Sequence, residues 1–519
     1  MSYHTIIIGA GAAGAILAAR LTEDPTRSVL LLEAGPDFPT LEEIPEEIRY
    51  SHSRPGNLWG RAFGPTTRYG WGYKATSTPN ADPIFVPRGK IMGGSTAVNA
   101  TIFLRGIPED YDAWAAQGND RWSFAQLLPF FCKNERDLDF QNAFHGNEGP
   151  IPAWRFKREE WSPDHAAFYT ACRAAGYADS PDQNAPDSTG VGPLAHNNLE
   201  GTRWSTAIGY LNPTRQRPNL TIQAESLVYR VIFEGRRAIG VVVEHRGELA
   251  TMDADEIIIC AGAIASPHLL LHSGIGPADD LLRLGIPVVQ DLPGVGQNLR
   301  DHSQLLVTLR TKADLPLDWR APRLNTALRY TAQGSSLRND MILIPCSNAP
   351  AESVTSDAPP VGFYIVPSLY LAVGSGSLHL TSTDPHVQPA LNYNYLAEPF
   401  DRIRLREGVR LILDLLDHPA YRAIVAERLT PTDADLTSDS ALDAWMLRTV
   451  TTSHHSSSTC KMGPTSDPMA VVDQFGKVHG MDGLRVVDAS IMPDCIRANT
   501  NVTTMVIGER VAELMRQGF

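Results

Sequence analysis

A glycine-rich turn near the start of the chain has the residue types and spacing of a dinucleotide-binding site. Gly9, Gly11 and Gly14 form a GxGxxG pattern, and Glu33 follows at the distance expected for a ribose-binding carboxylate. In such a pattern the first glycine permits a tight turn, the second lets the backbone approach a pyrophosphate, and the third allows a helix to pack closely. The chemistry predicted from these four residues is the binding of a dinucleotide.

The elements around this turn support that interpretation. Residues 5–8 and 29–32 are short apolar runs typical of buried strands, and residues 12–21 predict a helix rich in small side chains. A glycine-rich turn alone can be only a turn, but a strand before it and a helix after it favour phosphate binding at the helix N-terminus. The motif does not choose between NAD and FAD. We find no second GxGxxG, so one dinucleotide is expected.

Two later segments have features of a ligand-binding backbone. In residues 88–99, paired glycines precede small hydroxyl residues, a combination that can press flat against a ligand but also occurs in ordinary loops. The buried strand predicted at residues 256–260 is followed by Ala261 and Gly262. A strand that ends in small residues suits a parallel sheet whose strand ends face a cofactor.

The pattern of the sequence changes between residues 301 and 448. Apolar runs at 341–344 and 363–366 predict strands, and residues 399–416 predict an amphipathic helix. We interpret this region as a second, mixed domain that covers the cofactor and shapes a substrate cavity. A strand predicted at 483–490 and a final helix predicted within 499–515 resemble the elements near the start of the chain. The nucleotide-binding domain is therefore predicted to be discontinuous.

Composition limits the partners of the chain. Its 519 residues suit about two to four domain-sized units. A formal net charge of −13 argues against nucleic acid or an anionic membrane as the main partner. The six cysteines show no CxxC spacing, so neither a metal site nor a disulfide framework is predicted. With no basic leader before the first strand, the default expectation is a cytoplasmic protein.

Four sets of residues resemble the glucose–methanol–choline (GMC) oxidoreductases, FAD enzymes that oxidise alcohols. They span nearly the whole chain in the order of the family. The sets are the GxGxxG with Glu33; the block 89–99 with Phe103 and Gly106; the segment 262–267 running on to 273–276; and His455 with Thr459, followed by Asn499, Thr500 and Asn501.

The resemblance implies an α/β fold. A Rossmann-like FAD-binding domain would comprise residues 1–155, 195–300 and 453–519. A mixed α+β substrate-binding domain with an antiparallel sheet would comprise 156–194 and 301–452. Residues 145–152 and 498–501 make the chain most similar to bacterial oxidases of aromatic or heteroaromatic methanols, although these patterns also occur in choline-type members.

The resemblance also implies a catalytic pair. An alcohol must lose a proton from oxygen and a hydride from carbon, and histidine suits the proton transfer near neutral pH. His455 is the expected base, and Asn499 is the neutral donor expected to orient the substrate oxygen. An isolated histidine is more often structural, and we interpret the neighbouring His454 that way, since it should point away if the segment is extended.

Further residues are expected to hold FAD. The N-terminus of the last helix would face the flavin and stabilise its anionic reduced form. Asp488 would contact the ribityl or phosphate region, and the backbone of Val228 the adenine. The predicted cofactor-binding residues are Gly9, Gly11, Ala12, Ala13, Gly14, Glu33, Ala34, Arg88, Gly89, Met92, Gly93, Gly94, Ser95, Asn99, Ala100, Val228, Ala261, Gly262, Asp488, Ala489, Asn499, Thr500, Asn501 and Thr503.

The chain departs from the family pattern at two positions. Ser458 stands where the family usually has glycine, which could narrow the space beside the flavin. Val98 stands where some relatives attach FAD through histidine, so dissociable, non-covalent FAD is expected.

Several functions stay open at the level of sequence. The expected reaction is oxidation of a primary alcohol, of the hydroxymethylfurfural or pyridoxine type, with O2 or another electron acceptor. The alternatives are a choline-type dehydrogenase, a redox-neutral hydroxynitrile lyase, an FAD-binding protein without catalysis and an NAD-dependent dehydrogenase. No nucleic-acid or membrane partner is expected, and the chain is expected to be a monomer or a small homo-oligomer.

Overall fold

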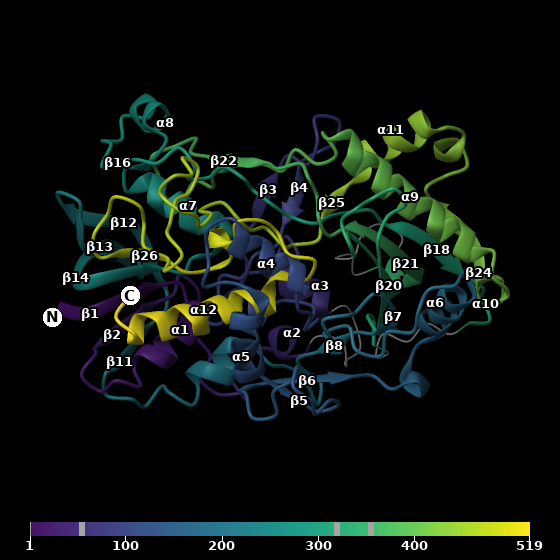
Figure 1. Ribbon diagram of the computed structural model, residues 1–519, viewed down its shortest axis with the longest axis horizontal. Helices are drawn as coiled ribbons and strands as arrows, with labels where there is room; N and C mark the ends of the chain where they lie inside the picture. The colour runs from purple at the N-terminus through teal and green to yellow at the C-terminus, as the bar shows by residue number, and fades with distance from the viewer. Residues whose placement is uncertain (1, 51–57, 316–321, 351–357) are drawn as a thin grey trace.

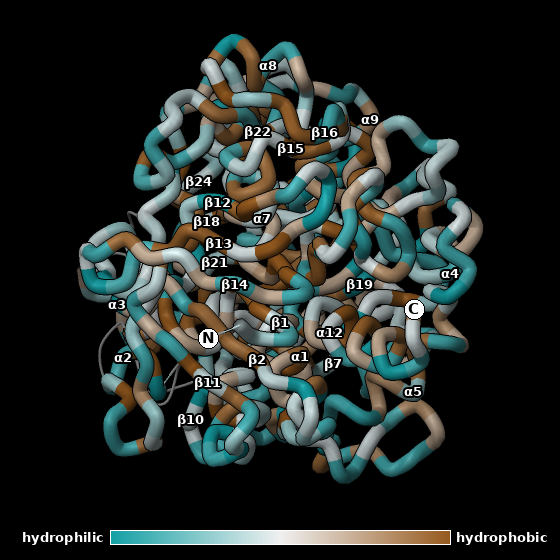
Figure 2. Tube along the Cα trace, turned by 90° about the vertical axis from the view of Figure 1, so that its left-hand side faces the viewer, coloured by the Kyte–Doolittle hydropathy of each residue, from teal (hydrophilic) through white to brown (hydrophobic). Residues whose placement is uncertain are grey.

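Two large β-sheets lie towards opposite ends of the molecule, with helices between and around them (Figure 1). The computed structural model describes residues 2–50, 58–315, 322–350 and 358–519. Apolar segments gather in the interior around β1 (Ser2–Ile8), β14 (Glu248–Ile259) and α7 (Gly262–His272), and hydrophilic segments lie mainly at the periphery (Figure 2). One continuous apolar core contains buried residues from both sheets, such as Ile258 and Ile365.

The first sheet combines a parallel part with an antiparallel hairpin. Its order is β11-β2-β1-β14-β13-β12, and β26 pairs with the second half of β14. The strands β11, β2, β1, β14 and β26 run parallel, whereas β12, β13 and β14 are antiparallel. The strands are β1 (Ser2–Ile8), β2 (Val29–Leu32), β11 (Leu220–Gln223), β12 (Ser226–Glu234), β13 (Arg237–His245), β14 (Glu248–Ile259) and β26 (Leu484–Val486).

The sequence of this sheet explains its position in the core. All four residues of β2 and the last four of β1 are buried, as expected for parallel strands that are covered on both faces. Helix α1 (Gly14–Leu21) follows β1 and lies beside the last helix, α12 (Thr500–Arg516). An ion pair of 2.8 Å between Arg20 Nη2 and the buried carboxylate of Glu509 joins these two helices from opposite ends of the chain.

The second sheet is antiparallel throughout. Its order is β24-β18-β21-β20-β19-β7, and β17 pairs with both β21 and β25. Helices α6 (Pro163–Ala174) and α9 (Pro399–Leu416) pack against this sheet at β20 and β21. The strands are β7 (Gly190–Pro193), β17 (Ser303–Gln304), β18 (Val307–Thr311), β19 (Thr326–Tyr330), β20 (Met341–Pro350), β21 (Pro360–Leu369), β24 (Val425–Thr430) and β25 (Thr451–Thr452).

Shorter elements connect the two sheets. The longer remaining helices are α4 (Pro108–Ala116), α5 (Phe124–Asn134), α6 (Pro163–Ala174), α7 (Gly262–His272), α9 (Pro399–Leu416) and α11 (Asp439–Thr449). The short helices are α2 (Glu46–Arg49), α3 (Leu58–Phe63), α8 (Ala278–Arg283) and α10 (Pro419–Arg422). Small sheets pair β3 (Tyr73–Ala75) with β4 (Ile84–Val86), β5 (Glu135–Asp137) with β6 (Ile151–Arg155), β6 with β8 (Ala195–His196), β9 (Asn198–Leu199) with β10 (Thr202–Arg203), β15 (Ile275–Gly276) with β16 (Gln290–Asp291), and β22 (Ser377–His379) with β23 (Ala390–Asn392).

The structure confirms the strongest periodic signals and adds elements that they did not show. The amphipathic helix predicted over residues 399–416 is α9, with the same bounds. The expected strands at 341–344 and 363–366 are parts of the longer β20 and β21. The hairpin strand β13 was not predicted. Among the described residues, no helix has both the length and the apolar surface that crossing a bilayer requires.

Candidate active site

A cavity of about 500 Å³ brings the predicted cofactor-binding residues together. It is lined from one side by the parallel strand ends and glycine-rich turns and from the other by the second sheet. All the predicted residues line it except Gly14, Met92, Gly93 and Thr503, and His455 lines it as well. Residues that are separated by hundreds of positions in the sequence therefore form one site.

The two glycine motifs meet at the floor of the cavity. Gly93 N donates to Ala10 O at 2.9 Å, and a Cβ on Gly94 would lie only 2.8 Å from Gly11 Cα. A Cβ on Gly11 would meet only Gly94 Cα, at 4.0 Å, so the space in front of Gly11 is open. A pyrophosphate can therefore approach the backbone here without a side chain in its way.

The four residues outside the cavity have structural contacts. A Cβ on Gly14 would lie 1.9 Å from Gly9 O, which fits its expected role in packing α1 against the preceding strand. Gly93 N donates to Ala10 O in the other glycine-rich turn, and the N of the buried Met92 donates to Pro36 O in the loop after β2. The side chain of Thr503 turns to the hydroxyl of Tyr111, at 2.8 Å, and it is Thr504 that lines the cavity.

Glu33 is held in place by backbone amides at the end of β2. Its Oε2 accepts from Ala10 N at 2.9 Å and its Oε1 from Gly35 N at 3.0 Å. Burial raises the pKa of this carboxyl to about 7, although the two amides oppose the shift. The carboxyl is thereby fixed at the cavity wall, in a position that suits a ribose hydroxyl.

Asp488 joins the strand end of β26 to helix α7. One carboxylate oxygen accepts from Gly262 N at 2.8 Å and from Ser266 Oγ at 2.5 Å, and the other accepts from Ser490 N at 2.8 Å. These contacts position the Ala261–Gly262 turn at the cavity. Any contact between Asp488 and a cofactor would be additional to this structural role.

The N-terminus of α12 opens onto the cavity. Asn499 is its N-cap residue, and Thr500 and Asn501 line the cavity wall. The amide nitrogen of Asn501 and the amide oxygen of Asn499 are buried without a hydrogen-bond partner in the described part of the chain. Buried polar atoms are rarely unpaired, so these two are consistent with a bound polar ligand. The positive end of the helix dipole favours an anionic group at the same place.

The predicted catalytic pair is in direct contact. His455 Nε2 and Asn499 Nδ2 lie 3.0 Å apart, and both residues line the cavity. Burial, together with the neighbouring His302, His454 and Arg88, holds the pKa of His455 well below its usual range. The ring is therefore neutral near pH 7 and can accept a proton.

A second histidine, which the sequence analysis did not identify, lies behind His455. The Nδ1 atoms of His302 and His455 are 2.9 Å apart, and His302 Nε2 lies 2.8 Å from Ile496 O. No spacing pattern marks His302, because 153 positions separate it from His455. Its adjacent acidic residue, Asp301, is the only local signal in the sequence.

His454 differs from its expected setting. The prediction that it points away from the cavity assumed an extended segment, but His454 has φ +68° and is among the residues that line the cavity. Its ring packs against Phe63 with centroids 5.8 Å apart, and its carbonyl accepts from Arg88 Nη1 at 2.8 Å. Burial lowers its pKa to about 3, and the charge of Arg88 acts in the same direction.

Ser458 does not narrow the cavity. It is fully buried outside the lining and has φ +71°, a left-handed conformation that glycine adopts freely and serine does not. Its backbone N donates to Ala489 O at 3.0 Å. The departure from glycine at this position thus affects backbone conformation, not the space beside the cofactor.

The side of the cavity that faces the second sheet is formed by one face of β20 and β21. Side chains at alternate positions share this face, and the register places Ile344 opposite Val366 and Cys346 opposite Tyr364. Residues from the second sheet and its connecting loops complete this wall without a carboxylate or a cation among the described residues. They are Gln304, Leu306, Leu324, Ile344, Cys346, Tyr364, Val366, Ser368 and Tyr370.

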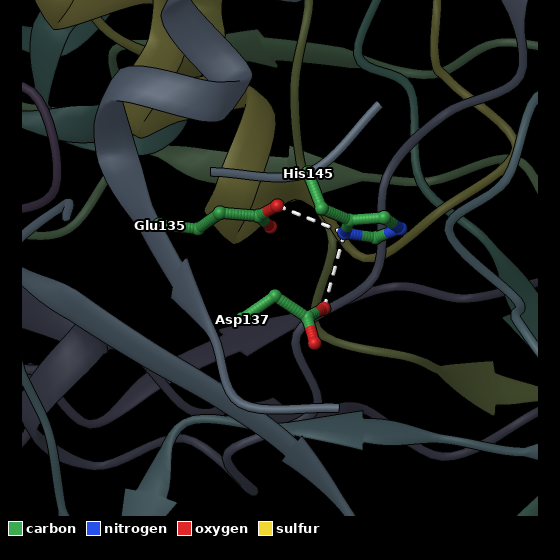
Figure 3. Close-up of side chains that lie close together, drawn as sticks. All are labelled: Glu135, Asp137 and His145. Atoms are coloured by element: carbon green, nitrogen blue, oxygen red, sulfur yellow. Dashed lines mark hydrogen bonds and ion pairs between the residues drawn. The ribbon is translucent and has the colours of Figure 1, made fainter. Parts of the chain in front are cut away.

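A buried charged cluster lies outside this cavity (Figure 3). His145 Nδ1 lies 2.9 Å from Glu135 Oε1 and 3.1 Å from Asp137 Oδ2, and its Nε2 lies 2.8 Å from Asp182 Oδ2. Arg105 pairs with Glu135, and Arg155 pairs with Asp137 and Asp182.

The donors of this cluster fit an ion-pair network better than a metal site. Its carboxylates could chelate a cation, but both ring nitrogens of His145 face carboxylates. Burial alone would lower the pKa of His145, yet hydrogen bonds to Asp137, Asp182 and Glu135 raise it to about 11. When both ring nitrogens of His145 carry protons, the three positive charges of His145, Arg105 and Arg155 balance the negative charges of the three carboxylates.

We predict that His145→Gln lowers the melting temperature by a few degrees at pH 6 and by less at higher pH. The imidazolium contributes its full stabilisation below pH 6.5, the ordinary pKa of a histidine in the unfolded chain. This contribution disappears as the pH rises to about 11, the pKa of His145 in the folded protein. Differential scanning calorimetry of both proteins at pH 6 to 10, at one scan rate, measures the difference. A difference in melting temperature between the two proteins that stays constant over this pH range would show that His145 is neutral in the folded protein.

The parallel sheet with its glycine-rich turn is joined through one cavity to an antiparallel sheet and a His–Asn pair, the arrangement of a two-domain, dinucleotide-dependent oxidoreductase. Profiles of the GMC oxidoreductase family match the chain over residues 3–304 and 372–508. The chain belongs to the GMC oxidoreductases, and it is an FAD-dependent enzyme of this alcohol-oxidising family.

Individual relatives cover nearly the full chain. It is 35% identical to an uncharacterised GMC-type oxidoreductase of Rhodococcus erythropolis, over 98% of this chain and 97% of the relative. It is 37% identical to an oxygen-dependent choline dehydrogenase of Paraburkholderia xenovorans, over 99% and 94% of the two chains. Its fold is similar to that of pyridoxine 4-oxidase from Mesorbium loti, with a TM-score of 0.90, 29% identity and 99% coverage of both chains.

Proposed function

We propose that this enzyme oxidises a neutral aromatic or heteroaromatic methanol, of the hydroxymethylfurfural or pyridoxine type, to the aldehyde. Hydride would pass to FAD, and O2 would take the electrons and form H2O2. The observation that carries the proposal is the uncharged wall of β20 and β21, which faces the same cavity as the His455–Asn499 pair. Aliphatic and aromatic side chains there suit the faces of a flat ring, and Gln304 and Ser368 offer it hydrogen bonds.

His455 and Asn499 are the residues that act on the alcohol in this proposal. The hydroxyl proton would move to His455 Nε2, while the Asn499 amide would donate to the substrate oxygen and hold it in place. Bound FAD supplies the hydride acceptor. The second sheet lines one side of the cavity, and the N-terminus of α12 provides positive potential at its edge.

Arg88 supports the choice of O2 as electron acceptor. It lines the cavity, and its guanidinium donates to the carbonyl oxygens of Pro87 and His454, at 3.0 and 2.8 Å, which are uncharged partners. A positive charge at the cavity stabilises the negative charge that forms as O2 is reduced. The non-covalent binding of FAD is proposed because Val98, on the cavity wall, offers no nucleophile.

The choline-type reaction is the main competing candidate, since chains named choline dehydrogenases are 36–37% identical to this one. A quaternary ammonium ion needs a carboxylate or a cage of aromatic rings. The described substrate wall provides no carboxylate, although Tyr364 and Tyr370 provide rings. For this reason choline belongs in the test beside the neutral alcohols.

The test is the visible spectrum of the purified holoenzyme before and after alcohols are added without air. The panel contains benzyl alcohol, hydroxymethylfurfural, pyridoxine, choline and glucose. We expect the flavin bands to bleach with one of the three ring alcohols and to return, with formation of H2O2, when air is admitted. Bleaching by choline alone would contradict the proposed substrate class, and bands that no alcohol bleaches would favour a redox-neutral lyase. A band that stays bleached in air but returns with an artificial dye would identify a dehydrogenase.

A further inference from the structure

We infer that His302 is a positioning residue that fixes the tautomer of His455 and so directs an unprotonated Nε2 into the cavity. The inference rests on the proposed role of His455 as the base. Four groups form an unbroken row of hydrogen bonds: Ile496 O, His302, His455 and the Asn499 amide, with separations of 2.8, 2.9 and 3.0 Å. Each step of this row determines the proton position in the next.

The carbonyl oxygen of Ile496 sets the direction of the row because it can only accept. His302 must therefore carry its proton on Nε2 and donate to that oxygen. Since His302 is neutral, its Nδ1 has a lone pair and accepts, and His455 must carry its proton on Nδ1. His455 Nε2 is then left with a lone pair, which faces the N–H of Asn499. If the protons pointed the other way along the row, the bare Nε2 of His302 would face the lone pairs of Ile496 O.

The second imidazole is itself held firmly. Its ring stacks on Tyr370, with centroids 4.2 Å apart and an interplanar angle of 11°. Asp301 Oδ1 accepts from the backbone N of both His302 and His455, at 2.8 Å each, and its Oδ2 accepts from Tyr395 and Thr452. One carboxylate thus connects the two histidine backbones, so the distance between the rings is fixed by the fold.

The charge of this arrangement differs from that of a histidine supported by a carboxylate. His302 is neutral, with a pKa lowered to about 3 chiefly by burial, with Arg300 acting in the same direction. The groups around His455 are His302, His454 and Arg88, which all act to lower its pKa, and the buried Asp301, whose Oδ1 accepts from the backbone N of His455 and not from its ring. A proton taken up at His455 Nε2 is therefore held only loosely. Because the row ends at a carbonyl, that proton can leave only towards the cavity.

Three substitutions at position 302 separate positioning from mere packing. His302→Leu removes the acceptor, and we expect flavin reduction by the best alcohol to slow by about 10- to 1,000-fold with FAD still bound. His302→Asn keeps an acceptor for His455 Nδ1–H and should restore the rate to within about tenfold of the wild type. His302→Asp provides a charged acceptor, which should raise the pH midpoint of the reduction rate because it stabilises a protonated His455.

Nitrogen NMR of the ¹⁵N-histidine-labelled holoenzyme reads the tautomer without any substrate. The His455 signals, assigned by their loss in His455→Ala, should show a protonated Nδ1 and a bare Nε2 in the wild type and in His302→Asn. In His302→Leu we expect a mixture of tautomers or a shift to protonated Nε2. His479→Leu is the control, since that imidazole also bonds to a backbone carbonyl, Gly463 O at 3.0 Å, but not to His455.

Two results would overturn the inference. One is a His302→Leu enzyme with the wild-type reduction rate and pH profile, and the other is an unchanged His455 tautomer in that variant. If no alcohol reduces the wild-type flavin, the proposed function fails, but the tautomer measurement still decides whether His302 orients His455. The two failures are thus distinguishable.

Discussion

His455→Ala should slow alcohol-driven flavin reduction by about 10²–10⁴-fold, the usual contribution of a general base. The ring is neutral, buried and in contact with Asn499 at the cavity wall, so its loss leaves no group in its place to take the hydroxyl proton. Anaerobic stopped-flow spectroscopy at the flavin band measures the rate. FAD content should stay near one per chain.

Asn499→Ala provides the matched comparison. It removes the hydrogen-bond donor beside His455 Nε2 but leaves the base in place, so reduction should weaken less than in His455→Ala while FAD stays bound. If Asn499→Ala instead releases FAD, Asn499 supports the cofactor. Wild-type reduction by His455→Ala would exclude His455 as the base.

Gly11→Val is expected to leave a folded protein that no longer retains FAD. The nearest atom to a Cβ at this position is 4.0 Å away, so the polypeptide accommodates the side chain, which then occupies the open space in front of the glycine turn. Loss of about two charge-assisted hydrogen bonds from the backbone to the pyrophosphate costs roughly 3–6 kcal/mol. That corresponds to about 10²–10⁴-fold weaker FAD binding.

FAD titration of the apoprotein by fluorescence quenching measures this effect, and circular dichroism verifies the fold. Gly14→Ala is the contrasting variant, because its Cβ would lie 1.9 Å from Gly9 O and should damage the packing of α1 itself. Gly11→Val that binds FAD as tightly as the wild type would show that the pyrophosphate does not lie against this turn.

The parts of the fold that depend on local pattern could be predicted from the sequence. The apolar runs of β1 and β2 and the period of helix α9 are visible within short windows, and the structure places these elements where they were expected. The hairpin strand β13 was missed because its half-buried residues give a mixed pattern. Its position depends on pairing with β12 and β14, which no short window contains.

The residues of the site likewise divide into those that the sequence could predict and those that it could not. Glycine motifs and the His455–Asn499 pair have fixed residue types, and the fold brings them to one cavity. His302 and the lining of β20 and β21 have no such signature, since they reach the site only through long-range pairing of the second sheet. Ser458 shows a further limit, because its left-handed backbone, not its side-chain volume, is the property that the fold uses.

The position of β26 in the first sheet has a consequence for biosynthesis. A ribosome delivers β1 first, but the strand beside β14 and helix α12 come from residues 484–516, after the whole second sheet has been made. At about 5–20 residues per second, the nascent glycine turn waits roughly half a minute or longer for the segment that completes its sheet. His455 and Asn499 arrive in the same late interval, so a chain stalled before them exposes an open sheet edge to chaperones and has no complete flavin site.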